Sequence, residues 1–264
     1  MQFGAMNFPI HPVIDEISRI ADLGFDYLEL AMDPPMAHYS ILKTQGNLIS
    51  RTLADRRLGL ICHLPTFVSI ADLTAGIRRA SLDEMCRSLE AAADLGAVKV
   101  VLHPGTIRGM AHYIPDTARA HCLESLDAIS RLAGDLGLPL CIENMFPGLG
   151  AYFEAAEYEP LFDRYPDMRM TLDTGHANIG APDGSRIRQF VKRFAARIDH
   201  VHISDNNGSA DEHLPPGGGS IDFQWLVSVL KAAGFNATVT FEIFTGKPGD
   251  LESSREKFIQ WWAQ

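Results

Sequence analysis

Short apolar runs alternate with longer amphipathic segments along the whole chain. The apolar runs predict strands, and the segments with apolar residues on one helical face predict helices. The strands are expected at residues 2–8, 27–31, 58–64, 99–104, 139–145, 168–174, 198–205 and 237–244. The helices are expected at residues 11–23, 47–57, 76–95, 115–136, 158–164, 185–195, 222–233 and 251–263. No linker or low-complexity segment interrupts this alternation.

Five junctions between predicted helices and strands share one residue pattern. A glycine follows the helix in ADLGFDYLEL, RRLGLICHL, ADLGAVKVV, GDLGLPLCIE and KAAGFNATVTF. Each of these glycines is expected in the left-handed conformation that often ends a helix. Repeated βα units predict an α/β fold, a closed parallel (β/α)8 TIM barrel in which residues 1–264 form a single domain. An open doubly wound sheet fits less well, because no GxGxxG turn follows an early strand.

Length and composition agree with one such barrel. The chain has 264 residues, close to the roughly 250 typical of the fold. Apolar residues make up 46% of it, enough for a large core. No apolar run approaches the roughly 18 residues that a membrane helix needs, and MQFGAMNF lacks the pattern of a secretory signal. The four cysteines form no CxxC pair, which favours a reduced, cytoplasmic protein without a membrane partner.

Charge bears on the class of substrate. The formal net charge is −10, and an acidic surface repels phosphate backbones unless a basic stripe overrides it. The basic residues form only small clusters in helix-like segments, where solvated faces are expected. The charge therefore weighs against nucleic acid and favours a small-molecule substrate, although bound cations would change the field at a site.

Metal-binding side chains gather where the predicted strands end. They are His63, His103, Glu143, Asp173, His176, His202, Asp211, His213 and Glu242. Side chains two apart on a strand share a face, which turns Glu143, Asp173 and Glu242 toward the barrel axis. Because the carboxyl ends of all the strands meet at one mouth of a barrel, we expect these side chains to converge there.

Four of these residues form the expected core of a metal site. Glu143, Asp173, His202 and Glu242 end strands five to eight, and carboxylates with an imidazole suit Zn²⁺, Mn²⁺, Mg²⁺ or Co²⁺. The structural alternative is a set of hydrogen-bonded polar residues in a barrel mouth. Burying several carboxylates without a cation is costly, because like charges must protonate or separate. The pattern therefore favours a divalent metal.

Additional ions are a second expectation. A second ion could lie between His63, His103 and Glu143; the alternative for the two histidines is contact with substrate or support of other ligands. Asp211 and His213 form a D-x-H pair, which on an extended stretch aims both side chains the same way. With His176 they would hold a third ion; the alternative is a loop of solvated charges.

Other residues near the predicted mouth have expected roles of their own. Glu29 ends strand two and is expected either to contact substrate or to orient a ligand. His200 shares a face with His202 one layer deeper and is expected in the core. The run of glycines at 217–219 is expected to let backbone pass close to a ligand, and Asp222 to cap the next helix.

These residues and their spacing resemble the xylose isomerase-like TIM-barrel superfamily, over nearly the whole chain from DYLEL to FEIF. That superfamily contains sugar phosphate isomerases and epimerases. For its epimerase branch, the resemblance implies one metal held by Glu143, Asp173, His202 and Glu242. It also implies that the two glutamates are catalytic and move a proton, and that His176 of DTGH contacts substrate.

The same superfamily contains the endonuclease IV family, which binds three zinc ions through nine ligands. The resemblance implies that the first ion takes His63, His103 and Glu143, and the third takes His176, Asp211 and His213. The second takes the four-residue core. The chain departs from that family, because the loops LPTFVSIADL and MDPPMAHYS carry no arginine for DNA. It departs from the epimerases too, because SDNNGSA lacks their basic substrate contact.

The leading hypothesis is a metal-dependent isomerase or epimerase of a small sugar or polyol. One to three ions, Zn²⁺ or Mn²⁺ first, would stabilise an enediolate while Glu143 and Glu242 transfer the proton. His63, His176 and Glu29 are the expected substrate contacts. The first alternative is a multi-zinc phosphodiesterase of AP endonuclease family 2, and the second is a non-catalytic sugar-binding barrel. A homo-oligomer is left open.

Overall fold

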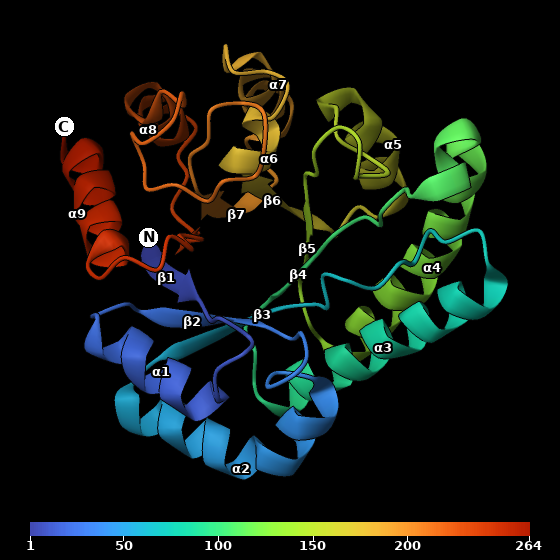
Figure 1. Ribbon diagram of the computed structural model, residues 1–264, viewed down its shortest axis with the longest axis horizontal. Coiled ribbons are helices and arrows are strands. Elements are labelled where there is room, and N and C mark those ends of the chain that lie inside the picture. The colour runs from blue at the N-terminus through green and yellow to red at the C-terminus, as the bar shows by residue number, and fades with distance from the viewer.

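Alternating strands and helices close into a barrel in the computed structural model, which describes residues 1–264 (Figure 1). Neighbouring strands pair in parallel in the order β1 to β8, and β8 pairs with β1 to close the ring. The strands are β1 Gln2–Met6, β2 Tyr27–Ala31, β3 Gly59–His63, β4 Val100–Leu102, β5 Leu140–Glu143, β6 Arg169–Asp173, β7 Ile198–Ile203 and β8 Thr238–Phe241. The fold is a single-domain TIM barrel, as the alternation predicts.

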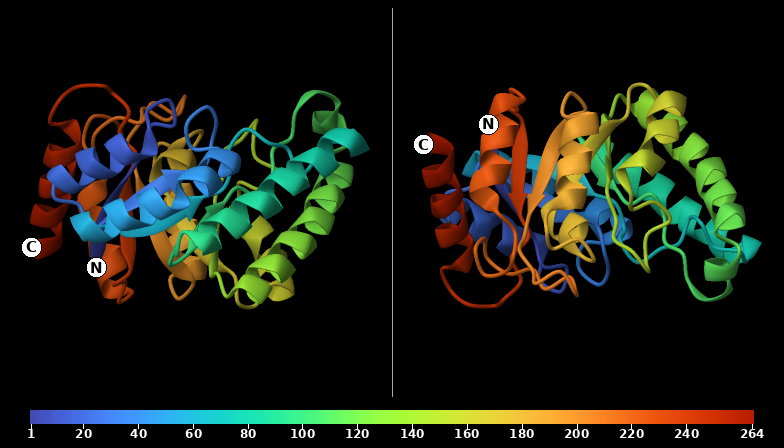
Figure 2. Two further views of the ribbon diagram at one scale, coloured as in Figure 1. Left: turned by 90° about the horizontal axis from the view of Figure 1, so that it is seen from below. Right: turned by 90° about the horizontal axis from the view of Figure 1, so that it is seen from above.

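Helices surround the strands on the outside (Figure 1). They are α1 Val13–Asp22, α2 Tyr39–Arg56, α3 Ala75–Asp94, α4 Pro115–Leu136, α5 Ala155–Arg164, α6 Thr174–Asn178, α7 Ser185–Phe194, α8 Phe223–Ala232 and α9 Asp250–Ala263, with a 3-10 turn η1 at Gly109–Tyr113. Both views in Figure 2 place α3 and α4 together at the end of the molecule opposite α9. None of these helices has the length and apolar character needed to span a membrane.

Two local expectations were wrong. Helix α2 begins at Tyr39 rather than residue 47, after His38, whose ring accepts from the Ser40 N–H; Gly46 inside it weakens the sequence signal, because glycine disfavours helix. The glycine of RRLGL does not end its helix: Arg57 takes the left-handed conformation, with φ of 53°. Gly24, Gly96, Gly137 and Gly234 do have positive φ, as expected.

The strands separate two apolar regions. Outward residues such as Leu28, Leu140 and Phe241 join the main core, between the strands and the helices. Inside the barrel lies a small cluster of Tyr27, Ile61, Val101 and Cys141. Above this cluster the inward residues are polar, so the candidate metal ligands lie at the carboxyl ends of the strands.

Candidate metal centre

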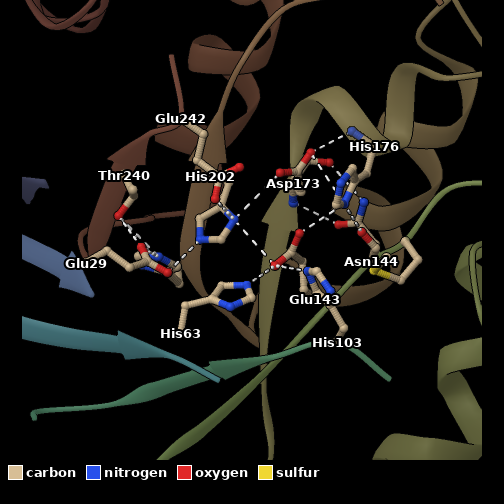
Figure 3. Close-up of polar contacts among 12 residues, drawn as sticks. Glu29, His63, His103, Glu143, Asn144, Asp173, His176, His202, Thr240 and Glu242 are labelled. Carbon is tan, nitrogen blue, oxygen red and sulfur yellow. Dashed lines mark hydrogen bonds and ion pairs between the residues drawn. The ribbon is translucent and has the colours of Figure 1, made fainter. Parts of the chain in front are cut away.

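The register of the strands determines which side chains point into the barrel at the site. Asp173 pairs with His202 across β6 and β7, and His202 pairs with Thr240 of β8. Paired residues point to the same face of the sheet, so Asp173 and His202 both face the barrel axis. Glu143 ends β5, and Glu242 follows β8 with its N–H donating to the Ile203 carbonyl at 3.1 Å. Figure 3 shows these side chains converging at one mouth.

The four-residue core meets around one nitrogen. Nδ1 of His202 lies 3.0 Å from a carboxylate oxygen of Glu242, 3.4 Å from one of Glu143 and 3.6 Å from one of Asp173. All four residues are buried, none more than 5% exposed. The structure therefore brings together residues that lie up to 99 positions apart along the chain, from Glu143 to Glu242.

Two further histidines share the carboxylate of Glu143. Its Oε2 lies 3.2 Å from Nε2 of His63 and 3.4 Å from Nε2 of His103. The two imidazole rings meet edge to face, with centroids 4.8 Å apart. Glu143 thus lies between this pair and His202 of the four-residue core, in the bridging position that the resemblance to the endonuclease IV family implies.

A third group lies on the other side of Glu143. His176 lies with Nδ1 2.9 Å from Glu143 Oε1 and Nε2 3.4 Å from Asp211 Oδ2. The same oxygen of Asp211 is 3.1 Å from Nε2 of His213. The two side chains of the D-x-H pair do meet, but the segment is not extended as expected. His213 has φ of 48°, and that left-handed bend turns its ring back toward Asp211.

Asp205 holds the loop that carries this pair. Its Oδ1 accepts from the N–H groups of Asn206 (2.9 Å) and Ile221 (3.1 Å), and its Oδ2 from those of Gly217 (2.8 Å) and Gly219 (2.9 Å). A Cβ at Gly219 would lie 2.3 Å from the Asn206 carbonyl oxygen. The glycine run therefore passes close to the Asn206 backbone and donates two N–H groups to a buried carboxylate of the protein; its approach to a ligand stays a prediction.

Glu29 lies beneath the site rather than in its mouth. Its carboxylate is fully buried and accepts from Nε2 of His202 at 3.0 Å and Nε2 of His200 at 2.8 Å. Both oxygens of Glu29 are thus held by side chains of the protein, and a substrate contact by Glu29 stays a prediction. This position agrees with the alternative that Glu29 orients a ligand. His200 lies in the barrel interior, as expected.

Burial and neighbouring charges both shift pKa values in the site. Burial lowers the pKa of His63, but the hydrogen bond and charge of Glu143 outweigh it and raise that pKa to about 9. Burial raises the pKa of Glu242 to about 7; the charge of His202 lowers it, while Asp173 and Glu143 add to the rise. The metal-free site therefore holds protons that an occupied site would lose.

Unpaired buried atoms and the distances between donor atoms both fit a divalent cation. His202 Nδ1 and Asp173 Oδ2 are buried without a hydrogen-bond partner, as is His103 Nδ1. Unpaired buried polar atoms are costly. Two ligands each about 2.1 Å from a zinc ion in tetrahedral arrangement lie about 3.4 Å apart, and the donor pairs around His202 Nδ1 span 3.0–3.6 Å. Nitrogen and carboxylate donors suit Zn²⁺ or Mn²⁺.

Sequence reasoning missed Asn144. Its side chain accepts from the Asp173 N–H at 2.8 Å and donates to the Asp173 carbonyl at 2.9 Å. Its own carbonyl lies 3.0 Å from Nδ1 of His176. Asn144 thus fixes the end of β6 relative to β5. Its position directly after Glu143 was the available signal, since an amide there can bond a neighbouring strand end.

A cleft of about 710 Å³ is lined by residues that include Met6, Phe8 and Phe244, and by none of the nine candidate metal ligands. The Phe244 ring lies 4.8 Å from that of His213 and 6.1 Å from that of Phe8. Phe244 therefore lines the cleft and also contacts His213.

Residues 17–263 match the family described as xylose isomerase-like TIM barrel. An uncharacterised protein of Methanocaldococcus jannaschii is 29% identical over 226 residues, 86% of this chain and 84% of that protein. A probable endonuclease 4 of Mycobacterium leprae is 27% identical over 250 residues, 89% of this chain and 91% of that protein.

Solved structures of similar fold include sugar epimerases. The structure of a D-tagatose 3-epimerase-like protein aligns with a TM-score of 0.83 at 24% identity, covering 100% of this chain and 97% of that one. The structure of an L-ribulose 3-epimerase aligns with a TM-score of 0.82 at 18% identity, covering 99% and 94%. At these identities the likeness establishes a common fold.

Proposed function

We propose a function from one premise: this chain belongs to the xylose isomerase-like TIM barrel family. The proposal is a divalent-metal-dependent epimerase or isomerase that acts on a small sugar or polyol-type ketone. The observation that carries it is the placement of two carboxylates, Glu143 and Glu242, against the same ring nitrogen, Nδ1 of His202, at the barrel mouth (Figure 3). Inverting a carbon next to a carbonyl needs one group to remove a proton and another to return it.

The four-residue core would hold the cation. Glu143, Asp173 and His202 offer donor atoms that lie within 4.8 Å of one another, and Glu242 approaches the same His202 nitrogen at 3.0 Å. His202 Nδ1 and Asp173 Oδ2 lack any hydrogen-bond partner. When bound, a divalent cation supplies a Lewis acid that polarises the substrate carbonyl and lowers the barrier to removal of the neighbouring proton. Zn²⁺ and Mn²⁺ both suit this donor set.

The two glutamates would move the proton. One ionised carboxylate takes the proton from the carbon beside the carbonyl, and the electrons of that C–H bond move toward the carbonyl oxygen. The other carboxyl returns a proton to the opposite face of the same carbon, which inverts it. Each group has to lie within hydrogen-bond reach of the proton it moves, and the burial of both keeps bulk water from competing.

Neighbouring residues would orient the substrate. His63 and His176 flank Glu143 and would contact substrate hydroxyls bound beside it. Phe244, which contacts His213, would pack against C–H groups of the substrate.

Proton exchange with solvent tests the proposal directly. Protein loaded with Zn²⁺ or Mn²⁺ is incubated in D₂O with a panel of ketopentoses, ketohexoses and keto-polyols. NMR should reveal deuterium at the carbon beside the carbonyl, together with the epimer, for at least one substrate. Glu143→Gln should abolish exchange, while Glu256→Gln, on the exposed face of α9, should keep it. Absence of exchange with the whole panel, or full exchange by Glu143→Gln, contradicts the proposal.

A second candidate is phosphodiester hydrolysis at a multi-zinc centre. It is favoured by donors beyond the four-residue core: His63, His103, His176, Asp211 and His213 all adjoin Glu143 or one another. A relative named as a probable endonuclease 4 points the same way. Zinc-loaded protein that cleaves abasic-site DNA, and holds about three ions per chain, would favour hydrolysis over epimerisation.

A further inference from the structure

A fully buried carboxylate lies under the donor cluster with no role in the proposed chemistry. Glu29 comes from β2, on the inner face of the barrel, and Figure 3 shows it on the far side of His202 from Asp173 and Glu143. Its Oε1 accepts from Nε2 of His202 at 3.0 Å. A charge in this position is costly unless each oxygen has a partner.

The second oxygen of Glu29 is held by other residues. Oε2 lies 2.8 Å from Nε2 of His200 and also accepts from the Thr240 hydroxyl. Because Thr240 gives its proton to Glu29, the Tyr27 hydroxyl, 2.8 Å away, donates to Thr240. The carboxylate is therefore fixed by three donors. His200 and Thr240, which hold its second oxygen, determine its orientation toward His202.

Glu29, His200 and His202 could also be considered as a cation site, because their donor atoms lie within 4.8 Å of one another. Hydrogen bonds already account for each of those atoms. The opposite edge of the His202 ring differs: Nδ1 is buried, has no hydrogen-bond partner and faces three carboxylates. Nε2 of His202 thus donates a hydrogen bond to Glu29, whereas Nδ1 is left without a hydrogen-bond partner.

We propose that Glu29 is a positioning residue that keeps the proton of His202 on Nε2 and presents the lone pair of Nδ1 to the cation. A carboxylate that accepts from the non-coordinating nitrogen of a histidine fixes its tautomer and orientation and raises its basicity as a ligand. His200 and Thr240 serve Glu29 by holding its other oxygen. This inference rests on the metal-holding part of the proposed function, and not on the identity of the substrate.

An isosteric substitution separates this role from simple packing. In Glu29→Gln, an NH₂ group replaces one of the two acceptor oxygens. Two donors converge on Oε2 and one on Oε1, so the amide oxygen should take the Oε2 position and the NH₂ should face His202. His202 then loses its bond, or its proton moves to Nδ1, where it opposes the cation. We expect Zn²⁺ affinity, measured by competition with a chelator, to fall about 10- to 100-fold.

Thr171→Val is the matched control. Thr171 lies on β6 beside His200 in the same buried layer, and its hydroxyl has no hydrogen-bond partner, so the isosteric change should leave Zn²⁺ affinity near that of the wild type. Circular dichroism and unfolding of the metal-free variants establish that each folds. A folded Glu29→Gln variant with wild-type Zn²⁺ affinity overturns the inference, as does an equal loss in Thr171→Val.

The wild-type protein provides a second test if Glu29→Gln does not fold. In zinc-loaded protein with ¹⁵N-labelled histidine, NMR should find the His202 proton on Nε2, exchanging slowly with water, and Nδ1 bound to the metal. Coordination through Nε2 instead would overturn the inference. If the wild type binds no metal at all, the proposed function fails first, so the two failures are distinguishable.

Discussion

Nδ1 of His202 lies 3.0 Å from Oε1 of Glu242. The two residues come from neighbouring strands, since His202 lies within β7 and Glu242 directly follows β8. Glu242, which the proposed mechanism uses to transfer a proton, therefore lies directly beside His202, which would bind the metal. Substitution of Glu242 should therefore affect turnover more than the fold.

Glu242→Gln should lower kcat by about 10²–10⁴-fold at saturating metal, the usual contribution of a positioned acid or base. The amide keeps the size of the side chain but cannot accept or return the proton. Steady-state kinetics on the substrate identified by deuterium exchange would measure the change, with Glu256→Gln as control. A kcat within threefold of the wild type at full metal occupancy would rule out Glu242 as a proton carrier.

Metal binding should release protons and strengthen as pH rises. The pKa of His63 is raised to about 9, against the lowering effect of burial, by Glu143. The pKa of His213 likewise rises to about 9, where the hydrogen bond of Asp211 and the charge of Glu242 outweigh burial. Ligands bind metal in their deprotonated forms, so these groups must lose protons if they coordinate.

Calorimetry in buffers of different ionisation enthalpy should detect proton release when Zn²⁺ is added at pH 7. The apparent affinity should rise between pH 6 and pH 9, as protonated histidines become rarer in the metal-free protein. A pH-independent affinity, with no release of protons, would mean that protonated groups of this cluster take no part in binding.

The hydrogen bonds accepted by Asp205 should hold the loop that carries Asp211 and His213 in its conformation. In Asp205→Asn, an NH₂ group would face backbone N–H donors, and hydrogen bonds to a charged group are worth about 1.5–3 kcal/mol each. We expect faster amide hydrogen exchange at residues 206–221, at Gly217 and Gly219 first. Ser209→Ala, in an exposed part of the same loop, should leave exchange unchanged. Equal protection in both variants would mean that the loop is held by other contacts.

The fold and the converging residues could be predicted because strand periodicity and loop position are local properties. Glu143, Asp173 and Glu242 alternate with outward apolar residues, so their direction could be inferred without coordinates. The orienting position of Glu29 could not be fixed in this way. Its partner His202 is 173 residues away, and only closure of the barrel places the two side by side.

Loop conformation was the weaker part of the sequence reasoning. The glycines at 217–219 allow many backbone paths, and nothing local indicates that Asp205 binds their N–H groups. Likewise, the D-x-H spacing suggested an extended segment, whereas His213 adopts a left-handed conformation. Arg57 took the helix-ending conformation assigned to Gly59, because the helix ends before the glycine. These outcomes depend on tertiary contacts.

Removal of metal should destabilise the protein. The metal-free mouth buries several carboxylates close to one another, and a cation that binds only the folded state adds stability by mass action, about 2.7 kcal/mol at a hundred times Kd. Thermal unfolding after chelation should show a lower Tm, restored by Zn²⁺ or Mn²⁺ but not by Na⁺. An unchanged Tm after complete removal of tightly bound metal would contradict a shared cation at this site.

Metal content measures most directly whether the donors share a cation. Elemental analysis of protein purified without chelator, or loaded with Zn²⁺ or Mn²⁺ and desalted, should find at least one divalent ion per chain. A double substitution, Asp173→Asn with His202→Gln, should lose the ion held by the four-residue core while Glu256→Gln retains it. A wild-type chain that keeps no divalent ion, or a double variant that keeps the full complement, would contradict the account.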